Sequence, residues 1–264
     1  MTSPRRPVQL FLSAHLDDAV LSCGGTMRWL ARRDFRVVVV TIFAGVPTGW
    51  PTPAARAARK ALGRSAGDVA RRRAEDRAAC STLGVEAVHL PFLDSVHRRR
   101  YGRPLYRTRA AIFGEPAAAD QALVAVAAQA LRGLDVWTRA ETIHAPLAIG
   151  QHVDHQLARR AAEAAARAQR NPVPPRPIRY YEDVPYVLYD AEALWRPDLA
   201  CRLVPLVRPL DEDCSNSRIT AINCYVSQLP SIWPNDPDWP IELRRHARAT
   251  AASDYGERLW SPTE

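Results

Sequence analysis

The sequence predicts an α/β fold with a mainly parallel central sheet that is covered by helices on both faces. Strand-like and helix-like segments alternate from residue 8 to residue 181, which is the order that repeated βαβ units produce. Residues Phe35–Phe43, FRVVVVTIF, are β-branched and almost continuously apolar, as expected for a strand covered on both faces. With 264 residues, of which 47% are hydrophobic, the chain is long enough to bury one large α/β core or two small ones.

The first part of the chain is expected to form a right-handed βαβ crossover. Its first strand is the apolar run VQLFLSA, and Gly24 and Gly25 in the next helix are expected to mark close packing against that strand. Gly84 is expected to cap the second helix. In chain order, the expected elements are a strand at Val8–Ala14, a helix at Ala19–Arg33, a strand at Phe35–Phe43, a helix at Asp68–Leu83 and a strand at Val85–Leu90.

The middle of the chain continues the alternation of helices and strands. Two alanine-rich segments have helical composition, and short apolar segments follow them. In chain order, the expected elements are a helix at Ala117–Arg132, a strand at Thr142–Ala145, a helix at Val153–Gln169, a Pro-rich turn at Asn171–Pro177 and a strand at Ile178–Tyr181.

The remaining segments carry weaker patterns. Gly45–Gly67 and Pro91–Pro116 are rich in Pro and Arg and are expected to be irregular loops with functional roles. Helices are expected at Ser215–Gln228 and Ile241–Ala252. We expect a single domain over residues 1–264, in which residues 183–264 form a less regular C-terminal portion.

Composition narrows the class of protein. The net charge is +8, but Lys60 is the only lysine among 36 basic residues, and the arginines are scattered without an aromatic stacking platform, so a nucleic-acid partner is not expected. No apolar run reaches the ~18 residues of a membrane span, and the N-terminus lacks an apolar signal core. Five cysteines without a Cys-x-x-Cys pair indicate neither a disulfide framework nor a thiolate zinc site. A cytoplasmic enzyme is expected.

Two polar segments stand at predicted strand-to-helix connections. Ala14–Asp18, AHLDD, follows the first strand, and His152–His155, HVDH, precedes a helix. In an open α/β sheet, ligands bind beyond the carboxyl ends of the strands, so both segments are expected at the same edge. One His and one Asp from the first segment with one His from the second would leave a fourth coordination position open, which is typical of a catalytic zinc.

The residues that do not bind the metal have chemical uses of their own. One of the adjacent carboxylates Asp17 and Asp18 can bind the metal while the other takes a proton from water. His152 can present an imidazolium to a developing oxyanion, and Asp154 can hold an imidazole in one tautomer. Taken singly, Asp18 and Asp154 are also ordinary residues for the first turn of a helix.

Together the two segments resemble the metal-dependent N-deacetylases called the PIG-L or LmbE-like family. The family signature Pro/Ala-His-Pro-Asp-Asp-Glu followed by Cys-Gly-Gly is similar to Ala14–Ala19 with Cys23–Gly25, and its His-x-Asp-His signature is similar to His152–His155. The resemblance implies a Rossmann-like three-layer sandwich. It also implies Zn²⁺, or another divalent metal such as Fe²⁺, as the cofactor.

The resemblance also implies roles for individual residues. The implied zinc ligands are His15, Asp18 and His155. Asp17 is implied as the general base, His152 as the oxyanion stabiliser and Asp154 as its supporting residue. Two positions depart from the family signature: Leu16 replaces the usual proline and Ala19 the usual glutamate.

Two weaker matches concern substrate binding. The segment RRAE that includes Arg72 resembles an Arg-x-x-Glu helix of the family, which implies a substrate-binding arginine. The segment LPFLD that ends at Asp94 resembles a segment whose aspartate binds sugar hydroxyls. The alternative for Arg72 is a solvated surface residue, since most arginines are exposed.

We therefore expect hydrolysis of the N-acetyl group of a 2-acetamido sugar in the biosynthesis of an antibiotic or another specialised small molecule. The positive charge would suit an anionic glycoside or one tethered to an acidic carrier protein. The alternatives are an amidase of a thiol conjugate and a non-catalytic sugar- or nucleotide-binding α/β protein. A dinucleotide-binding protein is disfavoured because no Gly-x-Gly-x-x-Gly turn follows the first strand.

Overall fold

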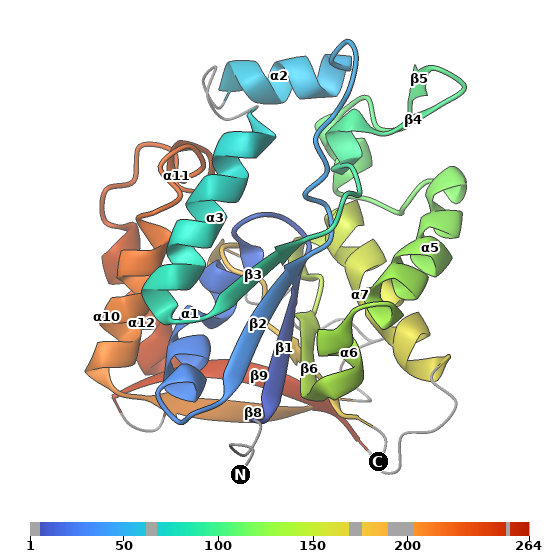
Figure 1. The fold of residues 1–264 in the computed structure, drawn as a ribbon. Helices are drawn as coiled ribbons and strands as arrows, with labels where there is room; N and C mark the ends of the chain where they lie inside the picture. Colours follow the sequence, from blue (N-terminus) through green and yellow to red (C-terminus); the bar gives the residue numbers. More distant parts are fainter. Residues whose placement is uncertain (1–5, 62–67, 169–175, 190–202, 252–253, 264) are drawn as a thin grey trace.

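The computed structural model describes residues 6–61, 68–168, 176–189, 203–251 and 254–263 (Figure 1). Its centre is a 7-stranded sheet. From one edge to the other, the strands are β3 (Glu86–His89), β2 (Arg36–Thr41), β1 (Val8–Ser13), β6 (Ala140–Pro146), β7 (Ile178–Tyr181), β9 (Tyr255–Pro262) and β8 (Leu203–Leu210). The first five are parallel, which confirms the predicted mainly parallel sheet.

The central strands are buried because their sequences are apolar on both faces. Every residue of β1 is buried, and β2 is buried from Val37 onward. The two strands pair in parallel from Val8 beside Arg36 to Ser13 beside Thr41. Strand β6 pairs with the other side of β1. The carboxyl end of β1 therefore lies in the middle of the sheet, where loops from several strands converge.

Helices cover both faces of the sheet and make the three layers that were predicted (Figure 1). One face carries α1 (Asp18–Ala31), α3 (Val69–Leu83), α10 (Glu212–Ile222) and α12 (Trp239–Thr250), and the other carries α5 (Gln121–Arg132), α6 (Asp135–Arg139) and α7 (Val153–Arg167). Asp68 caps the start of α3, and Gly84 ends it in a left-handed conformation with φ of 76°. Within the described residues, no helix is long and apolar enough to cross a membrane.

The C-terminal portion is more regular than predicted. Strands β9 and β8 pair antiparallel over their full lengths, and β9 joins the parallel part of the sheet beside β7. The sequence of β8, LVPLVRPL, contains two prolines that argue against a central strand. Prolines are tolerated there because β8 is the edge strand of the sheet. The expected helices at 215–228 and 241–252 correspond to α10 and α12, with shifted ends.

The two predicted loops also contain regular structure. Residues 45–67 include α2 (Pro53–Ala61), in which a proline occupies a favoured first helical position before an alanine-rich run. Residues 91–116 include a short hairpin of β4 (Arg99–Arg100) and β5 (Arg103–Pro104). Smaller elements are η2 (Ser95–His97), α4 (Arg109–Ile112), η3 (Ala118–Asp120), η4 (Ile149–Gln151), α8 (Tyr186–Tyr189) and α11 (Leu229–Ile232). Residues 62–67 and 171–175 of the expected loop and turn lie outside the described residues.

The two glycines of α1 make room for a buried ion pair rather than for the strand, which corrects the predicted contact. Arg218 and Glu257 form an ion pair at 3.3 Å against the middle of α1. Arg218 donates to the backbone oxygen of Leu21 at 2.9 Å, and Glu257 accepts the backbone N–H of Gly25 at 2.9 Å. A Cβ on Gly24 would lie 2.8 Å from Arg218. This ion pair anchors α1, whose first residue is Asp18.

Candidate metal centre

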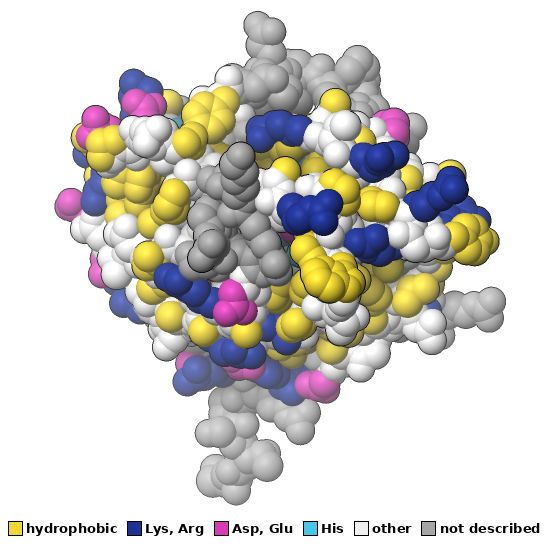
Figure 2. All heavy atoms as spheres, turned by 90° about the horizontal axis from the view of Figure 1, so that it is seen from above, with side chains coloured by type: hydrophobic (Ala, Val, Ile, Leu, Met, Phe, Trp, Pro, Cys, Tyr) yellow, Lys and Arg dark blue, Asp and Glu magenta, His cyan; other side chains and the backbone are white. Residues whose placement is uncertain are grey.

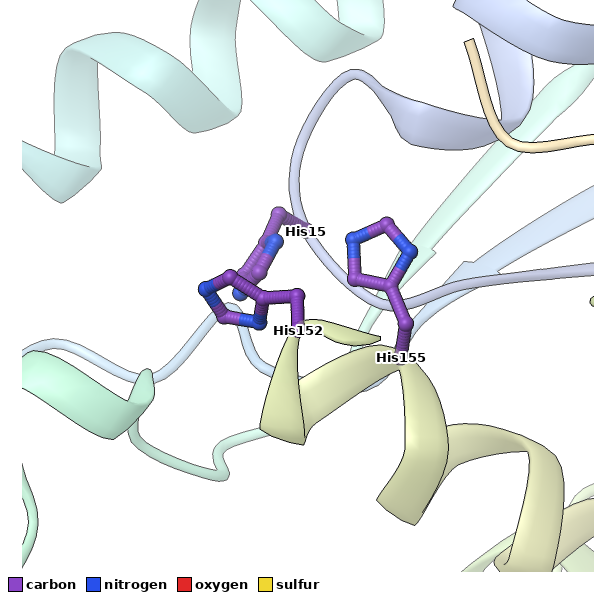
Figure 3. A group of neighbouring side chains, drawn as sticks. All are labelled: His15, His152 and His155. Atoms are coloured by element: carbon purple, nitrogen blue, oxygen red, sulfur yellow. The ribbon is translucent and has the colours of Figure 1, made fainter. Parts of the chain in front are cut away.

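Two connections bring the predicted site residues together beyond the carboxyl edge of the sheet. The turn after β1 holds His15, and the N-terminus of α7 holds His152 and His155. Figure 3 shows the three imidazoles facing a common space between these two connections. The ring centroids of His15 and His152 are 4.8 Å apart, and each lies 5.4 Å from the centroid of His155.

Asp18 completes a set of three potential metal ligands. Its Oδ2 atom lies 3.4 Å from Nδ1 of His15 and 3.2 Å from Nε2 of His155. Ligand atoms that sit about 2.0–2.2 Å from a tetrahedral zinc are separated by roughly 3.3–3.6 Å, so both distances suit one shared ion. Among the described residues, the buried Nε2 of His155 makes no hydrogen bond of acceptable geometry, although Oδ2 of Asp18 lies 3.2 Å away. Ligand atoms of His15, His152 and His155 also lie within 4.8 Å of one another. This cluster of imidazoles, with Asp18 beside two of them, therefore fits a divalent metal.

The charge balance also favours a cation. Burial opposes protonation of His155, but Asp18 and Asp183 outweigh it and raise the pKa of this imidazole to about 10. The same carboxylates that would hold a proton there can stabilise a metal ion in its place.

Asp183 is a residue that the sequence analysis missed. Its Oδ1 atom lies 2.6 Å from Nδ1 of His155, and its Oδ2 accepts the backbone N–H of Ile149 at 3.0 Å. A carboxylate on the far nitrogen of a histidine fixes the tautomer and orients the other nitrogen toward a metal. Asp183 lies two residues after the end of β7, so its place beyond a predicted strand was a signal that could have marked it.

The structure corrects the expected partner of Asp154. Its carboxylate contacts Nε2 of His15 at 2.9 Å and accepts the backbone N–H of Ser95 at 2.9 Å, instead of contacting the imidazole of His152. Arg98 donates to its other oxygen at 2.5 Å. Burial opposes ionisation, but Arg98 and His15 outweigh it and keep the pKa of Asp154 well below its usual range. Asp154 thus orients the imidazole of His15, as Asp183 orients the imidazole of His155.

Arg98 links this carboxylate to the loop that follows the site. It is only 7% exposed, and its Nε donates to Asp120 at 2.8 Å. Asp120 also accepts the hydroxyl of Tyr106 at 2.8 Å. The positive charge of Arg98 is therefore matched by two buried carboxylates, Asp154 and Asp120.

His152 differs from the imidazolium that the sequence analysis expected. Its Nδ1 atom accepts the backbone N–H of Asp154 at 3.1 Å, so this nitrogen carries no proton. Burial and the nearby charge of His15 lower the pKa of His152 to about 3. A neutral ring with its proton on Nε2 is the form that these contacts support, and that form still donates a hydrogen bond.

Asp17 has the properties of a proton acceptor. Its side chain is buried, and burial together with the charge of Asp18 raises the pKa of Asp17 to about 7. Arg72 lies beside it, with Nη2 at 3.7 Å from Oδ2 of Asp17. Arg72 is thus within the site and is not the solvated surface residue considered as its alternative.

Asp94 lies at the border of the site. Its Oδ1 accepts the backbone N–H of Val96 at 3.0 Å and so caps η2. Its Oδ2 lies 3.7 Å from Nε2 of His15, and its side chain is 22% exposed. All eight residues proposed from the sequence therefore meet in one place: His15, Asp17, Asp18, Arg72, Asp94, His152, Asp154 and His155.

The fold and the site define a three-layer α/β protein with an open cluster of His and Asp ligands at the carboxyl edge of its sheet. The family described as PIG-L: GlcNAc-PI de-N-acetylase matches residues 10–166. The chain belongs to this family, which confirms the predicted resemblance and the predicted fold.

Individual relatives extend the comparison. A 2'-N-acetylparomamine deacetylase of Niallia circulans is 34% identical over 191 residues, which cover 67% of this chain and 66% of that protein, just under two thirds of its length. A protein of the same name from Streptomyces fradiae is 28% identical over 98% of this chain and 91% of its own. The zinc inhibited form of teicoplanin deacetylase Orf2 superposes with a TM-score of 0.84 at 29% identity, over 97% of this chain and 98% of that one.

Proposed function

We propose that this protein hydrolyses the N-acetyl group of a 2-acetamido sugar and releases acetate and a free amine. The observation that carries the proposal is the position of Asp17, a buried carboxylate adjacent in sequence to the potential ligand Asp18. Among the described residues, the one basic side chain in an ion pair with Asp17 is Arg72, at 3.7 Å. A carboxyl group with a pKa near 7 accepts a proton at neutral pH and returns it readily.

His15, Asp18 and His155 would hold the metal, which we propose to be zinc. When bound, the metal would supply Lewis acidity toward the amide carbonyl and toward water. Nitrogen and carboxylate ligands also suit Fe²⁺, so the donor set alone does not select zinc. The carboxylates of Asp154 and Asp183 orient the two imidazoles and so prepare the ligand set before the metal arrives.

The remaining residues act on the substrate. Asp17 takes the proton from the attacking water. The Nε2–H group of His152 donates a hydrogen bond to the oxyanion that forms on the amide oxygen. Asp17 then gives its proton to the leaving amine, so the same carboxyl group serves as base and acid.

Arg72 and Asp94 are proposed to bind the substrate. Asp94 offers one carboxylate oxygen at the border of the site, where it can accept hydrogen bonds from sugar hydroxyls. Arg72 lies against Asp17 and would approach the acetamido group or a neighbouring hydroxyl. Its Nε is buried without a described partner, so a substrate oxygen would satisfy it.

The relatives named above support a small-molecule amino sugar of antibiotic biosynthesis as the substrate. The substrate proposed here is a small-molecule glycoside. The two other functions considered from the sequence, an amidase of a thiol conjugate and a non-catalytic binding protein, make different experimental predictions.

The test is the release of acetate and amine from a panel of N-acetylglucosaminides and N-acyl thiol conjugates by metal-loaded protein. Cleavage of the glucosaminides and not of the conjugates is the expected result. Preferential cleavage of the conjugates would support the amidase. Binding of the sugars without any turnover, in protein with a full complement of metal, would support the non-catalytic protein.

A further inference from the structure

A strongly basic segment follows the candidate metal centre along the chain. Residues 95–114 contain no Asp or Glu but six arginines. Arg98 is buried and matched by two carboxylates. The other five are exposed, and none forms an ion pair with a carboxylate in the described part of the chain. We call these five the rim arginines: Arg99, Arg100, Arg103, Arg107 and Arg109.

Arg109 connects this segment to the reacting centre. Its guanidinium lies 5.0 Å above the centroid of the Phe113 ring. The Phe113 ring meets the ring of His152 edge to face, with 5.2 Å between their centroids. A positive charge therefore stands one aromatic ring away from the imidazole that we propose to contact the amide oxygen.

The β4–β5 hairpin holds further rim arginines, at a greater distance from the candidate metal centre. Arg99 donates to the backbone oxygens of Trp50 and Gly102, at 3.0 and 2.9 Å, which ties the hairpin to the loop before α2. Trp50 is 90% exposed and Tyr101 is 89% exposed. Figure 2 shows several basic side chains around apolar ones on the right of this face, where Figure 1 places the hairpin.

Within the described residues, no carboxylate neutralises a rim arginine, although Arg100 and Arg109 lie over the rings of Tyr101 and Phe113, at 5.2 and 5.0 Å from the ring centroids. Two buried carboxylates beside this segment, Asp154 and Asp120, are paired with Arg98. Asp17 lies beside Arg72, and Asp18 belongs to the proposed metal ligands. Five uncompensated cations within a short segment repel one another, and an anion placed among them would relieve that repulsion. Arginine also binds carboxylate and phosphate through two parallel hydrogen bonds.

We propose that the rim arginines bind an anionic group, a carboxylate or a phosphate ester, on the part of the substrate that lies outside the N-acetylated sugar. The inference rests on the proposed deacetylation, because it names the class of glycoside that reaches the same centre. The exposed rings of Trp50 and Tyr101 would contact an apolar part of the same substituent. Sugars that carry several ammonium groups are disfavoured by like charge at this rim.

The experiment compares glycosides of one sugar that differ in charge. Metal-loaded protein is given N-acetylglucosamine 1-phosphate, N-acetylglucosamine 6-phosphate, methyl N-acetylglucosaminide and 2-aminoethyl N-acetylglucosaminide, and kcat/KM is measured for each. We expect a phosphate ester to exceed the methyl glycoside by about tenfold or more, and the aminoethyl glycoside to fall below it. The advantage of the phosphate should shrink as NaCl is raised, since salt screens exposed charges. Equal values for the charged and neutral glycosides would overturn the inference and leave the deacetylation intact.

Variants locate the effect. Arg109→Gln should reduce the advantage of the phosphate about tenfold and leave the methyl glycoside unchanged. Arg132→Gln is the matched control, because Arg132 is exposed at the end of α5, away from the carboxyl edge. Equal losses on all substrates in Arg109→Gln would mean that Arg109 supports the fold of the site and not an anion, and would overturn the proposal.

A binding measurement keeps the two proposals separable. Calorimetry on metal-loaded protein compares glucosamine 1-phosphate and glucosamine 6-phosphate with methyl glucosaminide, with and without Arg109→Gln. If no glycoside is cleaved but a phosphate binds through Arg109, the rim arginines still bind an anion and the deacetylation fails. Phosphate binding that is the same in Arg109→Gln would point to the metal itself as the binding group, and would contradict the inference.

Discussion

The Asp183 carboxylate lies 2.6 Å from Nδ1 of His155, and both side chains are fully buried. This contact occupies Nδ1 of His155 and leaves the Nε2 atom of the same ring for a metal. It also connects the end of β7 to the start of α7, so the ligand is oriented by the sheet and not only by its own helix.

Substitution of Asp183 should weaken metal binding in a graded way. Asp183→Asn keeps an acceptor for the imidazole N–H but removes the charge, so metal affinity should fall about tenfold. Asp183→Ala removes the acceptor as well, and the loss should approach 100-fold. Competition with a chelator measures both affinities, and Asp135→Asn, at an exposed carboxylate, is the control. Unchanged affinity in Asp183→Ala would show that this contact does not support the metal.

Asp17→Asn should separate chemistry from metal binding. The variant loses the proton acceptor, so kcat should fall by about 10²–10⁴, while the metal content of the purified protein stays at the wild-type level. Turnover of an N-acetylglucosaminide gives kcat, and metal analysis of the same sample gives the metal content. A variant with nearly normal kcat would require another group as the base.

His144 should make the protein less stable in mild acid. Its ring stacks on Phe11 at 4.1 Å between centroids, and Nε2 lies 3.2 Å from the side-chain oxygen of Gln9. Burial, with Arg179 and Arg208, lowers the pKa of His144 to about 3. In the unfolded chain a histidine has a pKa near 6.5, so as the pH falls the unfolded state binds this proton before the folded state does. The contribution of His144 to the free energy of unfolding is therefore complete above pH 6.5 and declines toward pH 3.

The measurement is urea unfolding at pH 7.5 and pH 5.5 for the wild type and for His144→Gln. The wild type should lose about 1.4 kcal/mol more than the variant on acidification. The difference between two proteins is used because the raised pKa of Asp17 acts in the opposite direction: folding favours its protonated form, so its contribution declines as pH rises from about 4 to 7. Equal losses in both proteins would mean that His144 titrates normally.

Gly25→Ala should destabilise the fold through the ion pair on α1. A Cβ there would lie 2.8 Å from Oε1 of Glu257 and 2.5 Å from Leu210. Glu257 cannot move aside freely because it accepts the backbone N–H of Gly25, so we expect a loss of about 1–3 kcal/mol in the free energy of unfolding. Gly133→Ala is the control, since its nearest contact is 3.4 Å and its φ of −73° suits alanine. An unchanged free energy of unfolding in Gly25→Ala would mean that α1 shifts to accommodate the added methyl group.

The parallel half of the fold was predictable because its strands are apolar runs with helical segments between them. Strands β8 and β9 were not, because β8 carries prolines that only an edge strand tolerates. The loop helix α2 was missed because proline and arginine dominate its surroundings. Such elements depend on neighbours that are distant in the chain.

The candidate site divides in the same way. Residues that sit directly in the two motifs, such as His15 and His155, were predictable from residue type and position at a strand end. Their partners were not, because Arg98 and Asp183 reach the imidazoles only through the folded structure. The role of Asp154 was assigned to the wrong histidine for the same reason: sequence neighbours on a helix start do not necessarily face each other.

The most direct test of the account is an anomalous difference map from crystals of the metal-loaded protein, recorded at the absorption edge of the metal. We expect one strong peak, about 2.0–2.2 Å from a nitrogen of His15, an oxygen of Asp18 and Nε2 of His155. A peak that omits any of these three residues, or a fully loaded protein with the metal elsewhere, would contradict it.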